Sequence, residues 1–150
     1  MQQSFGDVIK TTSGRKLYDI TPDLVSWINN QSINDGLLTL HIQHTSASIL
    51  INENYDSDVL VDLENFFSRL VLDGDHHFTH TTEGLDDMPA HIRTALTQTN
   101  LSLPVQNKKI LLGQWQGVFV FEHRYGDFKR KVKLHLIGEW LILNLSKQVD

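Results

Sequence analysis

The chain has 150 residues, of which 40% are hydrophobic and 21% charged, and this composition is typical of one folded domain rather than a disordered segment. Its net charge of -5 argues against a general nucleic-acid-binding protein, because neutralising phosphates requires a basic surface. Because the sequence contains no cysteine, disulfides and thiolate metal ligands are excluded, and any metal would bind to nitrogen and oxygen atoms.

The N-terminal segment lacks the basic and apolar regions of a signal peptide. No apolar run approaches the roughly 18 residues that are needed to cross a bilayer. We therefore expect a cytoplasmic protein with neither a membrane nor a nucleic acid as partner.

The first third of the chain alternates between strand and helix patterns. Residues 3–10 and 15–20 read as two short strands around a hairpin-like turn at Gly14. Thr21-Pro22-Asp23 is typical of a helix start, with the hydroxyl as the cap and proline at the first helical position. A helix is expected to follow, with Leu24, Trp27 and Ile28 at helical spacing.

A strand is predicted over residues 37–44, and its alternation assigns the side chains to two faces. Leu38, Leu40, Ile42 and His44 share the apolar, inward face. His41 falls on the other face, toward solvent or a neighbouring subunit. The small residues at positions 45–48 would let a ligand or another backbone come close to His44.

A second helix is predicted from Asp56 to about Leu70. Its apolar residues, Val59, Leu63, Phe66, Phe67 and Leu70, form one amphipathic stripe. We expect this helix to pack on the sheet and to be structural.

Residues 76–91 concentrate four of the eight histidines and three carboxylates in one segment. Folding alone gives little reason for this, because each such group must find a partner or stay in water. Histidine and carboxylate are also the groups that bind borderline divalent metals and transfer protons near neutral pH. His80 and His91 are the candidates, whereas His76 and His77 are interpreted as solvated loop residues.

A third helix is predicted from Pro89, with Ile92, Ala95 and Leu96 facing inward. His91 would lie in its first turn at the border of the buried face. The helix dipole disfavours protonation there, and the neutral imidazole is the form that binds metals. Asp86 and Asp87 can cap this helix, or one can cap it while the other faces the pocket.

The last third reads as strands. Residues 101–105 and 109–112 flank a hairpin turn, and strands follow at 118–123 and 128–138. In the last of these strands, Arg130 lies on the same face as the apolar residues, whereas Lys129 and Lys131 lie on the opposite face. Residues 140–150 are interpreted as a C-terminal extension strand. Together the elements predict a single α+β domain, a mostly antiparallel sheet or sandwich covered by about three helices.

The residues support a metal site on His44, His80 and His91. Three imidazoles with an open fourth position suit zinc or a related divalent ion such as magnesium. For His44 alone, a core histidine bonded to a backbone carbonyl is the simpler interpretation, and His123 and His135 are expected on sheet faces. Glu53, which follows a strand, is either a general base or an exposed acid. Trp115 is either a core residue or a substrate platform.

Six motifs, in this order, resemble the YjbQ-like family, also labelled secondary thiamine-phosphate synthase. They are His44-Thr-Ser-Ala-Ser48, Asn52-Glu-Asn54, His80 with Glu83-Gly84, Asp86-Asp-Met-Pro-Ala-His91, Gly113-Gln-Trp-Gln-Gly117 and Glu122-His-Arg124. The resemblance runs from about residue 3 to residue 139. Gln114 and the apolar tail after Glu139 depart from the family pattern.

The resemblance implies an α+β fold, a homotrimer with sites near subunit interfaces, and pocket histidines that bind a metal or an anion. It also implies a weak condensation of hydroxymethylpyrimidine diphosphate with thiazole phosphate, which releases pyrophosphate. Stabilising that leaving group requires a divalent ion and basic side chains. We assign Glu53, Asp87 and Arg130 as catalytic candidates. The substrate-binding candidates are Thr45, Ser46, Asn52, Trp115, Gln116 and Arg124.

Two other functions fit the same residues. A metal-dependent hydrolase would use the three histidines, with Glu53 activating a bound water. A non-catalytic trimeric ligand-binding module would need the assembly and not Glu53.

Overall fold

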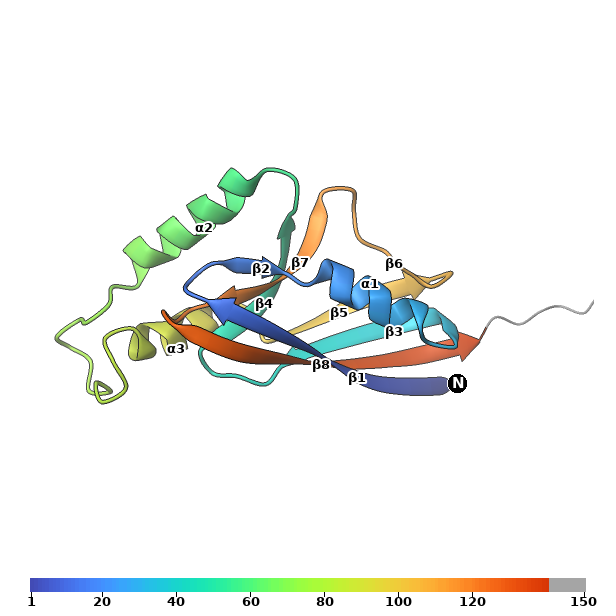
Figure 1. The fold of residues 1–150 in the computed structure, drawn as a ribbon, viewed down its shortest axis with the longest axis horizontal. Coiled ribbons are helices and arrows are strands. Elements are labelled where there is room, and N and C mark those ends of the chain that lie inside the picture. The colour runs from blue at the N-terminus through green and yellow to red at the C-terminus, as the bar shows by residue number, and fades with distance from the viewer. Residues whose placement is uncertain (141–150) are drawn as a thin grey trace, which may run out of the picture.

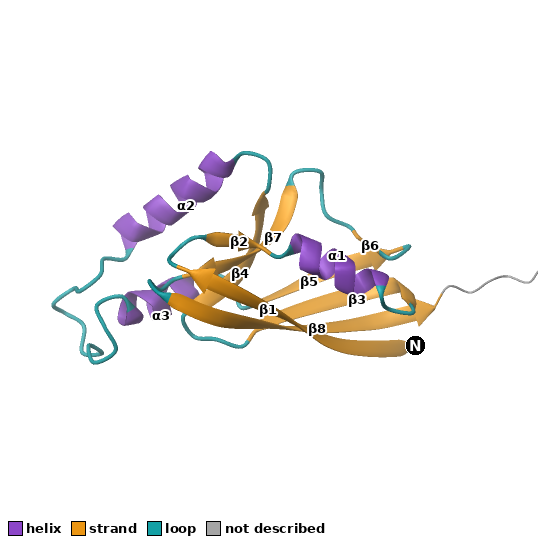
Figure 2. Ribbon diagram, viewed as in Figure 1, coloured by secondary structure: helices purple, strands orange, loops and turns teal. Residues whose placement is uncertain are grey.

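The computed structural model describes residues 1–140, which form two antiparallel β-sheets and three helices (Figures 1 and 2). The larger sheet has the strand order β1-β8-β3-β5-β6, and the smaller has the order β2-β7-β4. The predicted α+β class with a mostly antiparallel sheet is confirmed. The tail expected as an extension strand lies outside the described residues beyond Trp140.

The larger sheet is built around two long strands, β1 (Gln2–Ser13) and β8 (Asp127–Trp140), which pair along their whole length. On its other side β8 pairs with β3 (Ile33–Ile42), and β3 pairs with β5 (Asn100–Gln106). The short β6 (Lys109–Ile110) completes the sheet. Asn107 and Lys108 both have positive φ, as a two-residue primed turn requires, so the predicted hairpin is confirmed.

The smaller sheet consists of β2 (Leu17–Asp19), β7 (Gln116–Glu122) and β4 (Ala47–Glu53). The hairpin expected around Gly14 is therefore wrong. A turn does occur at Gly14, with φ +83°, but β1 pairs with β8 and β2 pairs with β7. Local turn chemistry predicts where the chain reverses, and long-range pairing decides which sheet each strand joins.

The main core lies between the two sheets and α1 (Thr21–Asn29). Strand alternation produces it: Leu38, Leu40 and Ile42 of β3 are buried, while His41 is exposed, as predicted. Leu24 and Ile28 of α1 are buried in the same core. The Thr21 hydroxyl does not cap this helix but accepts a hydrogen bond from the Val118 amide at 2.8 Å, and this ties α1 to β7.

Helix α2 (Ser57–Leu70) covers the other face of the smaller sheet and stands away from the body of the molecule (Figure 1). It begins one residue after the predicted start at Asp56, which caps it by accepting a hydrogen bond from the Asp58 amide. Leu63 and Phe67 pack against a small cluster of Leu17, Phe119 and Phe121. The rest of the predicted stripe is not covered, since Phe66 and Leu70 are 50% and 54% exposed. The helix packs on the sheet along only part of its apolar face.

Helix α3 (Asp87–Leu96) begins two residues before the predicted start and buries a different face. The buried residues are Asp87, Pro89, Ala90, Arg93 and Thr94. Ala95 and Leu96, which were expected to face inward, are exposed, so that prediction is wrong. The prediction from apolar periodicity failed for α3 because its inward positions include a paired arginine and an aspartate.

Within residues 1–140, the helices are all too short or too polar to cross a membrane.

Candidate functional site

Three side chains of the predicted histidine-rich segment converge on one point. The Nε2 atoms of His80 and His91 lie 2.6 and 3.0 Å from the same oxygen, Oδ2 of Asp87. All three ligand atoms are within 4.8 Å of one another. Asp87 is almost completely buried, with a side-chain exposure of 3%, whereas both imidazoles are half-buried. The carboxylate is therefore at the base of the cluster, and the imidazoles form its open side.

Helical spacing and a fixed loop bring these groups together. Asp87 and His91 are four residues apart on α3 and so share one face of its first turns. His80 comes from the loop between α2 and α3. Asp86 holds the end of that loop, because its carboxylate accepts hydrogen bonds from the Tyr125 amide at 2.9 Å and from Arg124. Asp86 thus occupies the N-cap position of α3, but its side chain bonds the turn after β7 and not the amides of the helix.

The hydrogen bonds of His91 determine what its second nitrogen can do. Nδ1 lies 2.8 Å from the carbonyl oxygen of Thr45, so Nδ1 must carry a proton and donate it. In the neutral ring Nε2 then has a lone pair, and it faces a carboxylate oxygen of Asp87. Two acceptors at 3.0 Å require a cation between or beside them, either a second proton on the ring or a metal ion.

The donor set fits a divalent metal. Two imidazole nitrogens and a carboxylate oxygen are ligands that zinc and similar ions accept. The bond from His91 to a backbone carbonyl is the outer contact that usually fixes a ligating histidine. Burial would raise the pKa of Asp87, but hydrogen bonds with His80 and Glu83 and the charges of His91 and Arg124 outweigh it and lower that pKa. Asp87 is therefore ionised at neutral pH and can serve as a ligand.

Arg124 is the basic residue beside this cluster. Its Nη2 donates to the Glu83 carbonyl at 2.7 Å, and its Nε lies 3.3 Å from Oδ1 of Asp87. Arg124 comes just after β7 in the sequence, and its side chain contacts the loop that Asp86 holds in place. A cation at this position can hold an anionic group of a ligand next to a metal ion.

His44 does not join the cluster. Strand β3 ends at Ile42, so His44 lies in the connection to β4, where its Nε2 accepts a hydrogen bond from the Lys131 amide at 2.8 Å. Burial, together with the charges of Arg130 and Lys131, lowers the pKa of His44. In the neutral ring the remaining nitrogen, Nδ1, then carries the proton and has no lone pair for a metal. The described cluster thus has Asp87 as its third ligand-type group, and the assignment of His44 as a ligand stays a prediction that its hydrogen bonding does not favour.

Arg130 faces inward, as its parity predicted, and is buried. Its Nε and Nη2 donate to the two carboxylate oxygens of Glu122 at 2.7 and 2.6 Å, and Nη2 also lies 3.1 Å from the Ser46 hydroxyl. The charge of Arg130 is thus neutralised by a buried carboxylate. Lys129 and Lys131 point to the opposite face of β8, so the three basic residues do not form one cluster.

The remaining candidates divide between the two ends of the smaller sheet. Ala47 of β4 pairs with Glu122, and Glu53 pairs with Gln116 at the other end. The rise of a strand separates these ends by about 20 Å. Thr45 and Ser46 lie at the end near His91. The far end holds Asn52, Glu53, Trp115 and Gln116. There the exposed Trp115 ring packs against Tyr55, with 4.8 Å between the ring centroids. Within one chain, Glu53 is far from the metal-type ligands.

A second polar cluster, around His123, was not found from the sequence. His123 was expected on a sheet face but is completely buried. Its Nδ1 accepts from Nε of Arg93 at 3.2 Å, and its Nε2 lies 2.8 Å from the Ser48 hydroxyl. Arg93 also pairs with Glu64 of α2. Burial, followed by the charges of Arg93, Arg15 and Arg130, lowers the pKa of His123 to about 2.

The proton positions make this second cluster structural. Since Nδ1 of His123 accepts from Arg93, Nε2 must donate its proton to Ser48. The imidazole therefore cannot take a proton from the serine, as a general base would need to do. The cluster instead joins β4, β7, α2 and α3.

Comparison with known proteins finds one protein family that matches most of the chain. The family model described as "UPF0047 protein YjbQ-like" matches residues 8–139. A UPF0047 protein of Synechocystis is 44% identical over 88% of this chain and 90% of its own length. The UPF0047 protein YjbQ of Escherichia coli O157:H7 is 39% identical over 86% of this chain and 94% of its own.

Solved structures show the same fold. A YjbQ/UPF0047-family protein of Clostridium acetobutylicum superposes with a TM-score of 0.78 at 30% identity, covering 87% of this chain and 98% of its own. A YbjQ-like protein of Sulfolobus solfataricus P2 superposes with a TM-score of 0.83 at 21% identity, covering 92% and 99%. The two-sheet architecture is thus shared across archaeal and bacterial relatives.

Proposed function

The chain belongs to the YjbQ-like UPF0047 family, and from the geometry of its histidine cluster we propose that it is a divalent-metal-dependent enzyme acting on a small phosphate-bearing molecule. The observation that carries this proposal is the convergence of His80, His91 and Asp87. The Nδ1 of His91 is committed to the Thr45 carbonyl, which leaves Nε2 directed at a shared carboxylate oxygen. A buried carboxylate with two half-exposed imidazoles offers three ligands and an open side, as catalytic sites for zinc-like ions do.

Arg124 supports phosphate as the ligand group. Its guanidinium is beside Asp87, and guanidinium groups match the geometry of phosphate oxygens. A divalent ion bound here would stabilise negative charge on a leaving phosphate or pyrophosphate group. Arg124, whose side chain is 20% exposed, takes the phosphate-binding role in this proposal rather than the buried Arg130.

The specific reaction that we propose is the condensation of hydroxymethylpyrimidine diphosphate with thiazole phosphate. The carbon–oxygen bond to pyrophosphate breaks, a carbon–nitrogen bond to the thiazole forms, and pyrophosphate leaves. Asp87, kept ionised, would hold the two imidazoles in position, and Arg124 would bind the departing phosphates.

This reaction is tested by incubating the purified protein with both substrates and added zinc or magnesium, and by measuring thiamine phosphate and pyrophosphate together. We expect metal-dependent formation of both products in equal amounts. Asp87→Asn should abolish it, whereas Trp115→Phe, at the far end of the smaller sheet, should retain it. Equal activity in the wild type and in Asp87→Asn would overturn the proposal.

A metal-dependent hydrolase is the second candidate, and the position of Glu83 favours it. The Glu83 carboxylate is exposed and lies 3.6 Å from Nε2 of His80, so it replaces the distant Glu53 as the group that would accept a proton from water. Metal-dependent release of phosphate from a simple phosphate ester, lost in Glu83→Gln and kept in Glu53→Gln, would support hydrolysis over condensation.

We also propose that the chain assembles as a homotrimer. A cyclic trimer requires two different complementary surfaces on each copy. Among the exposed apolar residues, Tyr55 and Trp115 form one group, and Phe66, Leu70, Leu72 and Leu85 belong to α2 and the loop that follows it. Light scattering at several concentrations should give three times the mass of the chain, and a monomer at micromolar concentration would contradict this assembly.

A further inference from the structure

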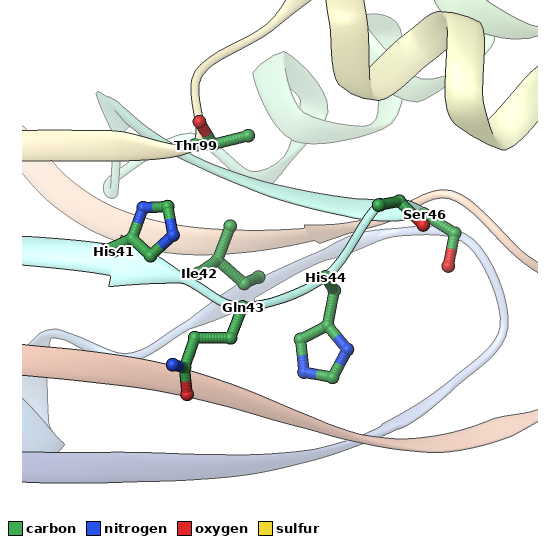
Figure 3. Close-up of a pocket in the computed structure, with 7 residues that line it drawn as sticks. His41, Ile42, Gln43, His44, Ser46 and Thr99 are labelled. Carbon is green, nitrogen blue, oxygen red and sulfur yellow. The ribbon is translucent and has the colours of Figure 1, made fainter.

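Two open pockets share part of their lining next to His91. The first, of about 460 Å³, is lined by the end of β3 and the connection to β4 (Figure 3). The second, of about 410 Å³, is lined by that connection and by α3. His44, Thr45 and Thr99 line both pockets, and His91 lines the second. The surface that these two adjoining pockets form is here called the hydroxyl groove.

The lining of the hydroxyl groove is rich in hydrogen-bond donors. Hydroxyl groups come from Thr45, Ser46, Thr94 and Thr99, and a ring N–H comes from His44. Of the described residues that line these cavities, none is an aspartate or a glutamate. On a chain with a net charge of -5, such a surface would repel an anion less than other surfaces do.

His44 acts as a donor here. Its Nε2 accepts the Lys131 amide proton, so the neutral ring carries its own proton on Nδ1. Figure 3 shows the ring of His44 on the connection that follows β3, with Thr99 on the neighbouring segment. Lys131, whose backbone amide bonds this ring, adds a positive charge at this end of the groove, whereas the charge of Arg130 is balanced by Glu122.

Thr94 gives an independent indication of a ligand. The residue is only 8% exposed, and within residues 1–140 its buried Oγ1 finds no hydrogen-bond partner. Buried hydroxyls are normally satisfied by protein or by a bound molecule. Thr94 lines the groove one helical turn after His91, so rotation of its side chain about χ1 would bring Oγ1 to an acceptor oxygen of a ligand.

We propose that the hydroxyl groove binds the phosphate group of the substrate, with His44 and Thr94 as hydrogen-bond donors, so that the rest of the molecule reaches the cluster of His80, Asp87 and His91. This inference rests on the proposed function for the reaction at the cluster. The groove itself, however, binds phosphate without requiring the metal. A phosphate offers only acceptor oxygens near neutral pH, and this groove offers donors without a carboxylate.

The experiment is a titration of metal-free, ¹⁵N-labelled protein with inorganic phosphate, followed by two-dimensional NMR, with chloride at equal ionic strength as the control. Saturable shifts of the amides at residues 44–46 and 94–99 are expected. His44→Phe should weaken the apparent Kd by at least about tenfold and Thr94→Val by about fivefold. Thr39→Val, on the exposed face of β3, should bind like the wild type.

The same samples are then titrated with zinc, so that the two proposals can fail separately. Normal zinc binding with phosphate affinity unchanged in both groove variants would overturn the groove and leave the cluster intact. Shifts that occur only after zinc is added, and only around His80 and His91, would also overturn it. Phosphate binding that is lost in the variants while the wild type binds no zinc would support the groove and overturn the proposed metal enzyme.

Discussion

A histidine cluster lies on each of two sides of helix α3. The two clusters differ in whether the hydrogen-bonding capacity of their imidazole nitrogens is already used. His91 and Arg93 are two residues apart, so they point about 200° apart around the helix. On the side of Arg93, His123 is completely buried and both of its ring nitrogens have a defined donor or acceptor partner. On the side of His91, the ring is half-buried and its second nitrogen faces a carboxylate oxygen.

This difference separates a structural histidine from a candidate ligand. Counting protons and lone pairs satisfies both ring nitrogens of His123 without any added species, and Nη1 of Arg93 is the one group of this cluster that lacks a partner among residues 1–140. The same count leaves the cluster of His80, Asp87 and His91 in need of a cation. Residue type and proximity alone would not distinguish them, because Ser48 and His123 also lie at the distance of a catalytic pair.

The largest effect on stability is expected from a substitution of Arg93, in the structural cluster around His123. Arg93→Met removes the partner of Glu64 and the donor to Nδ1 of His123, so the free energy of unfolding should fall by about 3 kcal/mol, because breaking a buried ion pair strands the remaining group. Urea unfolding measures this. Arg69→Met, at the exposed end of α2, should change stability by less than about 0.5 kcal/mol. A loss below about 1 kcal/mol in Arg93→Met would contradict the structural role.

At His91 the effect should appear in metal affinity and not in folding. His91→Ala should weaken zinc binding by about a hundredfold, or about 2.7 kcal/mol, because one of three ligands is lost. Isothermal titration measures the affinity. The stability of the metal-free protein should change by less than about 1 kcal/mol, since the ring is half-exposed. His77→Ala, on the exposed part of the same loop, is the matched control, and an equal loss there would move the site to Asp75, His76 and His77.

The buried histidine should contribute to acid sensitivity. His123 stays neutral in the folded chain down to about pH 2, whereas in the unfolded chain it binds a proton below about pH 6.5. The unfolded state therefore holds more protons between these values, and stability falls as the pH falls below 6.5. Well below that pH the contribution is about 1.4 kcal/mol per pH unit.

His123→Gln should remove this contribution. The variant is expected to be less stable at pH 7, but its free energy of unfolding should decline less steeply than that of the wild type between pH 5.5 and pH 4.5. Urea unfolding at three pH values gives both slopes. Parallel slopes would mean that His123 is not buried neutral in the folded chain.

The smallest effect is expected at Ser48. Ser48→Ala leaves the Nε2 proton of His123 without an acceptor and should cost about 1 kcal/mol of stability. Zinc affinity and the proposed condensation activity should stay at the wild-type level, because Ser48 is not a nucleophile here. Loss of activity with stability retained would assign the Ser48–His123 pair a chemical role.

Much of the fold could be predicted from local patterns, because strand alternation and helical spacing report which face is buried. The inward parity of Arg130 and the exposure of His41 followed from this. What failed depends on long-range partners. The strand pairing around Gly14 is set by β7 and β8, and the buried face of α3 is set by Glu64 and His123, which pair with an inward arginine.

The site was predicted in part for the same reason. The composition of residues 76–91 indicated His80 and His91 as ligands with Asp86 or Asp87 nearby, because the segment holds more ligand-type residues than a loop needs. The hydrogen bond of His44 to the Lys131 amide could not be predicted, because it joins residues 87 positions apart. The distance of Glu53 from the cluster followed only from the direction of β4 along the sheet.

X-ray absorption spectroscopy of the zinc-loaded protein would show whether two histidines and an aspartate bind a divalent ion. We expect outer-shell scattering from two imidazoles with a carboxylate oxygen, unchanged in His44→Ala and reduced to one imidazole in His80→Ala. Scattering from three imidazoles that falls to two in His44→Ala would contradict this expectation and restore His44 as a ligand.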